Sequence, residues 1–204
     1  MGLIRNITQN TKCKFLNFFT MDVTHKSGAD SRYFVASRAQ DVDQLKAVTH
    51  KNTADGVIIY SVYGEQRDKV VLVRQYRYPI DGYIYEFPAG LVEEGEDFKE
   101  AGIRELKEET GLLLDAISVP DMYSKPYFTT IGMTDESCGT VYGYAKGEPS
   151  IAGQEDSEEI EIVLADKEEV RRILKEENVA IMCAYMLMHF LESEDGHPFD
   201  FLGE

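Results

Sequence analysis

Three glutamates stand close together near the middle of the chain, at Glu105, Glu108 and Glu109. On a helix, residues three or four positions apart project from the same face, so these carboxylates would be neighbours. Like charges this close repel each other unless a cation lies among them, and Mg²⁺ prefers oxygen ligands and keeps several waters. The spacing therefore predicts a divalent metal site that can also take up phosphates. Taken alone, a glutamate-rich run is usually only a solvated helix face.

The residues just before these glutamates fit such a site. Arg104 lies four positions before Glu108, which is the spacing of a helical ion pair. We expect Arg104 to orient one carboxylate while the others hold metal. The loop from Gly90 to Glu96 can bring backbone carbonyls and one more carboxylate back toward the helix.

The elements that must position these residues follow from turn residues and periodicity. The glutamates fall in a predicted helix over Phe98 to Thr110, with Asp97 as its N-cap and Gly111 as its C′ residue. Pro88 to Gly90 predicts a loop before it. Further helices are predicted over Asp166 to Glu177 and Val179 to Ser193. Predicted strands cover Lys14 to His25, Arg32 to Arg38, Val57 to Tyr63, Val70 to Tyr78, Tyr83 to Phe87, Leu112 to Val119, Gly139 to Ala145 and Ile160 to Ala165.

Length and composition bound the class of protein. A chain of 204 residues, 43% hydrophobic and 28% charged, predicts one globular domain with a small appendage. We place an N-terminal β-appendage at 1–50 and the main domain at 51–204. The formal charge of −16 repels polyanions, so we expect no nucleic-acid partner, and an anionic substrate would need a local cation.

Cysteine usage and apolar segments predict the compartment. Cys13, Cys138 and Cys183 lie far apart, which leaves no disulfide framework and no zinc-site spacing, so we expect a reducing cytoplasm. We expect no signal peptide at the start of the chain, and the apolar stretch Val179 to Leu191 is too short to span a bilayer. We therefore expect no membrane association.

The segment from Gly90 to Leu112 carries a specific pattern. It matches G-x5-E-x7-R-E-U-x-E-E-x-G-U at all nine specified positions, and so resembles the box of the Nudix hydrolases. The resemblance implies an α/β (α+β) fold, in which a mixed β-sheet lies between helices. It also implies metal-assisted attack of water on a nucleoside diphosphate linked to another group.

Roles in the metal site follow from the same resemblance. Glu105 and Glu109 match the principal Mg²⁺ ligands, and Glu108 matches an additional ligand or orienting group. Ala89 matches a ligand that acts through its carbonyl. Arg104 and Glu108 are therefore counted with the catalytic residues, and Mn²⁺ is a possible substitute for Mg²⁺.

Residues before the box indicate one branch of the family. Val73 to Pro79 and Glu86 to Gly90 look like the QxRxP and ExPAG elements of the ADP-ribose pyrophosphatases. The resemblance implies that Arg77 contacts the substrate, and a surface arginine on a strand is the alternative. Glu86 and Leu91 are further substrate-binding candidates. Arg38, at the end of the second predicted strand, is a weaker one.

Two segments after the box extend the resemblance. Gly132 to Glu136 resembles the S-P-G-x-T-x-E loop of the branch, with Glu136 matching a glutamate of the substrate site. Ile131 takes the place of the proline associated with ADP-ribose specificity, which leaves other nucleoside diphosphate sugars open. In the acidic segment that follows, Asp156 and Glu158 both stand where the branch carries its catalytic base, and a merely solvated loop is the alternative.

These features predict a Mg²⁺-dependent pyrophosphatase that cleaves ADP-ribose or a related nucleoside diphosphate sugar to a nucleoside monophosphate and a sugar phosphate. GDP-mannose, NADH or a dinucleoside polyphosphate stay open as substrates, as does a non-catalytic Nudix module that binds a nucleotide sugar. The branch exchanges its appendage across a homodimer, so we expect a homodimer here. The appendage docking on its own main domain is the alternative.

Overall fold

The structure, a computed structural model, describes residues 2–154 and 159–203. The chain forms two compact units. The first unit comprises Met1–Asp55 and Pro126–Cys138, and the second comprises Gly56–Lys125 and Gly139–Glu204. The boundary near residue 50 between an appendage and a main domain stays a prediction.

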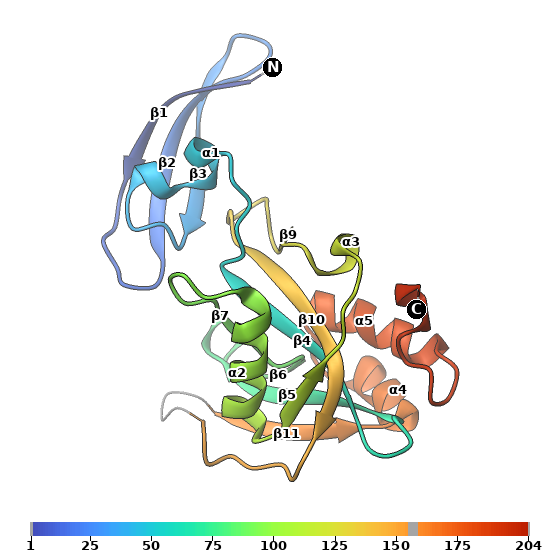
Figure 1. The fold of residues 1–204 in the computed structure, drawn as a ribbon. Coiled ribbons are helices and arrows are strands. Elements are labelled where there is room, and N and C mark those ends of the chain that lie inside the picture. The colour runs from blue at the N-terminus through green and yellow to red at the C-terminus, as the bar shows by residue number, and fades with distance from the viewer. Residues whose placement is uncertain (1, 155–158, 204) are drawn as a thin grey trace. The chain divides into compact units, whose positions relative to one another are not determined.

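The elements alternate irregularly between strands and helices (Figure 1). The strands are β1 (Leu3–Gln9), β2 (Asn17–Thr24), β3 (Asp30–Ser37), β4 (Gly56–Tyr63), β5 (Lys69–Arg77), β6 (Gly82–Glu86), β7 (Ala89–Leu91), β8 (Leu113–Ala116), β9 (Tyr127–Phe128), β10 (Ser137–Lys146) and β11 (Ile160–Ala165). The α-helices are α1 (Lys46–Thr49), α2 (Phe98–Thr110), α3 (Asp121–Ser124), α4 (Lys167–Glu176) and α5 (Ile181–Glu192), and short 3₁₀ turns cover Val42–Gln44, Tyr78–Ile80 and Asp200–Leu202.

The first unit contains an antiparallel three-stranded sheet in the order β1-β2-β3. The sequence predicted its β2–β3 hairpin but not β1, whose residues are mostly exposed and carry no continuous apolar run. Alternation along the strands buries one face of the sheet, where Phe19, Met21 and Val35 pack with Leu45. The first unit therefore has a small core of its own.

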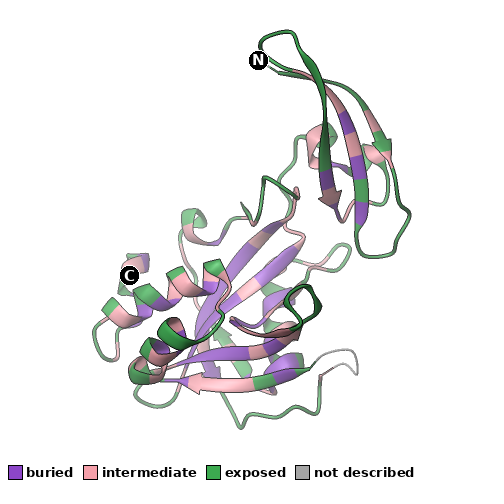
Figure 2. Cartoon of the chain, turned by 180° about the vertical axis from the view of Figure 1, so that it is seen from behind, coloured by how far each residue is buried: buried purple, intermediate pink, exposed green. Residues whose placement is uncertain are grey.

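The sheet of the second unit follows the order β11-β5-β4-β10-β8, with β6 paired to β5 and β7 paired to β4. Helix α2 covers one face, and α4 and α5 cover the other (Figure 1). Period-two alternation in β4 explains this, because Val57 and Ile59 pack toward α2 while Tyr60 and Val62 pack toward α4 and α5. Buried residues accordingly line the strands (Figure 2). The predicted fold class, a sheet between helices, is confirmed.

Most predicted elements are present, with small differences at their ends. Helix α2 and strand β11 begin and end at the predicted residues. The loop predicted at Pro88 to Gly90 is wrong in part, because Ala89–Leu91 forms strand β7. Its residue Gly90 pairs with Val57 of β4, a partner far away in the sequence that no local pattern reveals.

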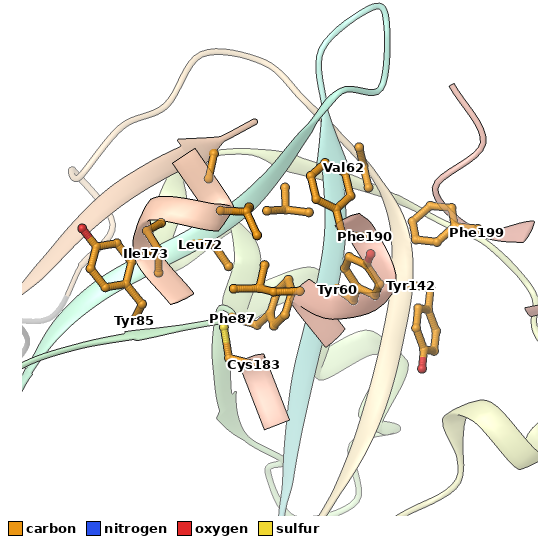
Figure 3. Packing of buried hydrophobic residues seen from close by; sticks show 14 of the residues in the cluster. Tyr60, Val62, Leu72, Tyr85, Phe87, Tyr142, Ile173, Cys183, Phe190 and Phe199 are labelled. Carbon is orange, nitrogen blue, oxygen red and sulfur yellow. The ribbon is translucent and has the colours of Figure 1, made fainter. Parts of the chain in front are cut away.

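The larger core surrounds the ring of Tyr60 (Figure 3). Ring centroids of Phe87, Tyr142 and Phe199 lie 5.0, 5.8 and 5.6 Å from the Tyr60 centroid, all in tilted or edge-on geometries. The hydroxyl of Tyr60 is fully buried and has no hydrogen-bond partner among the described residues. Burial also raises the pKa of this phenol well above its usual value.

In the parts of the chain that the structure describes, no helix is both long and apolar enough to cross a bilayer.

We predict opposite effects for two tyrosines of this core. Tyr60→Phe removes a buried hydroxyl without a partner and should raise the free energy of unfolding by about 1 kcal/mol. Tyr142→Phe removes a hydroxyl that donates to the Tyr123 carbonyl at 3.2 Å, and should lower it by about 1 kcal/mol. Urea titration of both variants measures these changes. Lower stability of Tyr60→Phe would mean that the hydroxyl has a partner, such as a buried water.

Candidate active site

Helix α2 carries the three glutamates, and its ends are set by local chemistry. The Asp97 side chain accepts a hydrogen bond from the Lys99 N–H at 2.8 Å, and Gly111 adopts a left-handed conformation with φ of 72°. Both predicted caps are thereby confirmed. They set the register that places Glu105 and Glu109 on one side of the helix.

One side of α2 packs tightly on the sheet. A Cβ atom built on Gly102 would lie 2.9 Å from Val141 Cγ2, so a larger residue would push the helix away from β10. Ala101 and Leu106 are fully buried beside it. Glu109 lies about one turn beyond Leu106 on this side of the helix. It is therefore only 3% exposed, although it carries a carboxylate.

Strand β7 brings its backbone against the Glu105 carboxylate. A Cβ atom built on Gly90 would fall 1.9 Å from the Glu105 Cδ and 2.1 and 2.3 Å from its two oxygens. Only glycine therefore leaves room for the carboxylate in its present position. The first glycine of the sequence pattern thus has a steric role that spacing alone does not reveal.

The next residues along the site hold Glu109. The Ala89 N–H donates to its Oε2 at 3.3 Å, and the side-chain amide of Gln154 donates to its backbone carbonyl at 2.7 Å. Gln154 also lies at the C-terminal end of α2, where carbonyls lack helical partners. The sequence does not predict this contact, because Gln154 and Glu109 lie 45 residues apart and no spacing links them.

Arg104 connects the loop before α2 with the glutamates on it. Its Nε and Nη2 donate to the two oxygens of Glu96, each at 3.0 Å, and Nη2 also donates to the Leu91 carbonyl at 3.1 Å. Its Nη1 donates to Glu105 Oε1 at 2.8 Å and Glu108 Oε2 at 3.0 Å. These contacts raise the pKa of the Arg104 guanidinium, chiefly through Glu96, and lower the pKa of the Glu96 carboxyl.

Carboxylate oxygens are the donors that a hard divalent cation prefers, so the residue types fit such an ion. The missing side chain of Gly90 leaves room for one of these carboxylates, that of Glu105, against the backbone of β7. Across residues 2–154 and 159–203, however, no three acidic, histidine or cysteine side chains converge closely enough to hold a metal. The carboxylates of Glu105 and Glu108 are instead turned toward Arg104. Arg104 thus neutralises part of their charge.

The predicted substrate-binding residues form two separate pairs. In the second unit, Arg77 Nε lies 2.7 Å from Glu86 Oε2 across the paired strands β5 and β6. In the first unit, Arg38 Nε and Nη2 both lie 2.7 Å from Glu136 Oε1. Leu91, the remaining candidate, is 38% exposed.

The two candidates for the catalytic base, Asp156 and Glu158, lie outside the described residues. Their assignment stays a prediction.

A further polar cluster in the first unit was not predicted. Lys46, whose side chain is 11% exposed, donates to Asp55 Oδ2 and to Ser137 Oγ, each at 2.5 Å. Asp55 Oδ2 also accepts from the Ser137 N–H at 2.9 Å. The cluster ties the residue after Glu136 to α1, and its members are too far apart in the sequence for any pattern to join them.

The comparison with protein families decides the classification. The model of the NUDIX domain matches residues 52–185. The chain belongs to the NUDIX domain family. The resemblance of the box from Gly90 to Leu112 is thereby confirmed.

Relatives within the NUDIX family include proteins that are named for an activity. Over 162 residues the chain is 28% identical to the ADP-ribose pyrophosphatase of Saccharomyces cerevisiae. The match covers 77% of this chain and 66% of the yeast protein. Over 95 residues it is 44% identical to the putative nudix hydrolase 2 of Caenorhabditis elegans, covering 43% of this chain and 41% of that protein. The chain thus spans less than two thirds of both relatives.

A solved structure described as an ADP compounds hydrolase has the same NUDIX fold. It superposes with a TM-score of 0.62 over 86% of this chain and 83% of its own, at 18% sequence identity.

We predict that Gly90→Ala displaces the Glu105 carboxylate, because the new methyl group would overlap it while the helix and strand stay in place. Any activity that depends on Glu105 should fall by roughly a hundredfold, the cost of misplacing a catalytic group by about 1 Å. Gly82→Ala is the control, since a Cβ there meets only the Ile80 carbonyl at 3.6 Å. Circular dichroism checks the fold of both variants. Full activity of Gly90→Ala would contradict the steric role.

Proposed function

We propose that this protein is a divalent-metal-dependent pyrophosphatase that cleaves ADP-ribose or a related nucleoside diphosphate sugar to a nucleoside monophosphate and a sugar phosphate. The observation that carries the proposal is the placement of Glu105 and Glu109 against β7, at Gly90 and Ala89. Family membership and the yeast relative support the same class of reaction.

Glu105, Glu108 and Glu109 would hold the metal, Mg²⁺ or Mn²⁺, together with the Ala89 carbonyl. A bound divalent ion supplies Lewis-acid stabilisation of the charge that develops on the phosphoryl oxygens. The chain's own contribution is to position two of the carboxylates: β7 limits where Glu105 can lie, and the Ala89 N–H holds Glu109. The net charge of −16 makes a local cation necessary before a diphosphate can approach.

The substrate would be bound by arginines now paired with glutamates. Arg77 is 46% exposed in its side chain, so its guanidinium keeps donors free to face a phosphate or a base while Glu86 orients it. Arg38 and Glu136 offer a second such pair. The base that accepts the proton of the attacking water is proposed to be Glu158 or Asp156.

The preferred substrate is open among nucleoside diphosphate derivatives. The names of the yeast relative and of the solved structure point to ADP compounds. Ile131, where the branch carries a proline, favours testing other nucleoside diphosphate sugars as well.

We also propose that the protein forms a homodimer through the first unit. Phe18 and Phe34 stack with ring centroids 5.8 Å apart, yet they are 42% and 53% exposed on the face opposite its core. Phe15 and Leu16, just before β2, are also exposed. A second copy of the chain would remove this apolar surface from water, and symmetric pairing is the commonest assembly.

We further propose that the protein works in the cytoplasm. The three free thiols fit a reducing compartment, and burial keeps Cys138 protonated by raising its pKa to about 12.

The function is tested with purified protein, Mg²⁺ or Mn²⁺, and a panel of ADP-ribose, GDP-mannose, UDP-glucose, NADH and diadenosine polyphosphates. Phosphorus NMR should detect a nucleoside monophosphate and a sugar phosphate from at least one of them. If none is cleaved, the proposal is wrong, and tight binding without turnover would identify a non-catalytic binding module instead.

We predict that Glu109→Gln lowers kcat by roughly a thousandfold, because one charge is lost where the metal must be held. The amide oxygen can still accept the Ala89 N–H, so the fold should persist. Glu100→Gln is the matched control, since it makes the same change at an exposed position of α2. Unchanged kcat of Glu109→Gln at saturating Mg²⁺ would exclude Glu109 as a ligand.

The dimer is tested by Phe34→Asp, with Tyr185→Asp as a control that changes an exposed aromatic residue on α5. Light scattering should report a dimer for the control and a monomer for Phe34→Asp. Point variants are better than deleting the N-terminus, because Tyr33 and Ala36 hydrogen-bond to Gly132 and Met133 and hold the Pro126–Cys138 segment. A monomeric unmodified protein would refute the dimer.

A further inference from the structure

Arg104 divides its five hydrogen bonds between two sets of acceptors. Nε and Nη2 face the loop before α2, where they contact both oxygens of Glu96 and the Leu91 carbonyl. Nη1 faces the helix and alone contacts Glu105 and Glu108. A guanidinium has five N–H donors, so all of them are used. One nitrogen therefore contacts two of the proposed metal ligands, and the other two nitrogens contact neither.

The loop contacts do not depend on Nη1. Glu96 accepts hydrogen bonds from Nε and Nη2 of Arg104, a pair of contacts that we call the fork. Its Oε2 also accepts a hydrogen bond from the Glu93 N–H at 3.0 Å. The side chain of Glu96 is only 17% exposed, so this bidentate pair is partly shielded from water. The loop would thus stay attached to α2 if the Nη1 contacts were lost.

The charge around Nη1 is unbalanced. Glu96, Glu105 and Glu108 carry three negative charges against one guanidinium, and the buried Glu109 lies on the same side of α2. The Glu105 side chain, 15% exposed, cannot relax toward β7, because it already lies against Gly90. Within this group of side chains the carboxylates therefore carry more negative charge than the Arg104 guanidinium can neutralise, and Nη1 is the cationic nitrogen that lies against Glu105 and Glu108.

We propose that Nη1 of Arg104 holds the place of a divalent cation on Glu105 and Glu108, and that the cation, when it binds, displaces these two hydrogen bonds while the fork on Glu96 stays. This inference rests on the metal site of the proposed function. It gives Arg104 two effects of opposite sign: the residue keeps the metal-free carboxylates together, and it competes with the metal for them.

The test measures Mn²⁺ binding without substrate, from the EPR signal of free Mn²⁺, in three proteins. Arg104→Met should bind Mn²⁺ about tenfold more tightly than the unmodified protein, the size expected from removing one positive charge within ~5 Å of a divalent ion in a water-like dielectric. Arg172→Met is the matched control. Arg172 lies on α4, not on α2. Like Arg104, it contacts both oxygens of one carboxylate, that of Glu169, and it also contacts a second carboxylate, that of Glu177. The Arg172→Met protein should bind Mn²⁺ with the affinity of the unmodified protein.

Thermal unfolding with and without Mn²⁺ supplies a second readout. In the presence of a chelator, Arg104→Met should unfold at a lower temperature than the unmodified protein, because its carboxylates repel each other without a cation. Saturating Mn²⁺ should restore most of the loss. Arg172→Met should lose the same stability in both conditions. An Arg104→Met protein that folds only with Mn²⁺ would also support the exchange.

Three results would overturn the inference: unchanged or weaker Mn²⁺ affinity in folded Arg104→Met, a loss of stability that Mn²⁺ does not restore, or failure to fold even with Mn²⁺. Each would mean that the Nη1 contacts are needed alongside the ion. If the unmodified protein binds no Mn²⁺, the proposed function fails together with the inference. If it binds Mn²⁺ and cleaves substrate but Arg104→Met does not bind more tightly, only the inference fails.

Discussion

Repulsion among the carboxylates on one side of α2 is the constraint on which the centre of the second unit depends. Glu105, Glu108 and Glu109 repel one another, and the protein holds them with the Arg104 guanidinium, the Ala89 N–H and a strand whose Gly90 leaves room for the Glu105 carboxylate. The unfavourable charge is thereby kept in place. Stability of the fold and readiness for a cation are opposed at this site, as they often are where chemistry is done.

The rest of the second unit holds α2 close to the sheet. Gly102 and Ala101 let the helix approach β4 and β10, and the aromatic cluster around Tyr60 packs α4 and α5 against the other face. Because the strands alternate between these two cores, movement of either layer would be transmitted to β7 through its pairing with β4. The distance between Gly90 and Glu105 therefore depends on packing well beyond the site.

Local signals predicted α2 to the residue, because its caps Asp97 and Gly111 lie next to it in the sequence. The box predicted which glutamates meet, because helical spacing fixes neighbours. Strand β7 was missed because its partner in β4 lies more than 30 residues away, and Gln154 and Lys46 were missed because their bonds join distant segments. Exposed β1 carries too little apolar alternation to signal a strand. What sequence could predict was local or matched a family pattern; contacts between distant residues required the structure.

The Pro126–Cys138 segment belongs to the first unit, although in the sequence it separates the two stretches that form the second unit. Its hydrogen bonds to Tyr33, Ala36 and Arg38 tie it to β3 and the residue that follows it. A gene fusion that added only residues 1–55 to another NUDIX protein would therefore transfer only part of the first unit. The other part, residues 126–138, would be left behind. Chimeras that exchange the N-terminal region should therefore carry the internal segment with it.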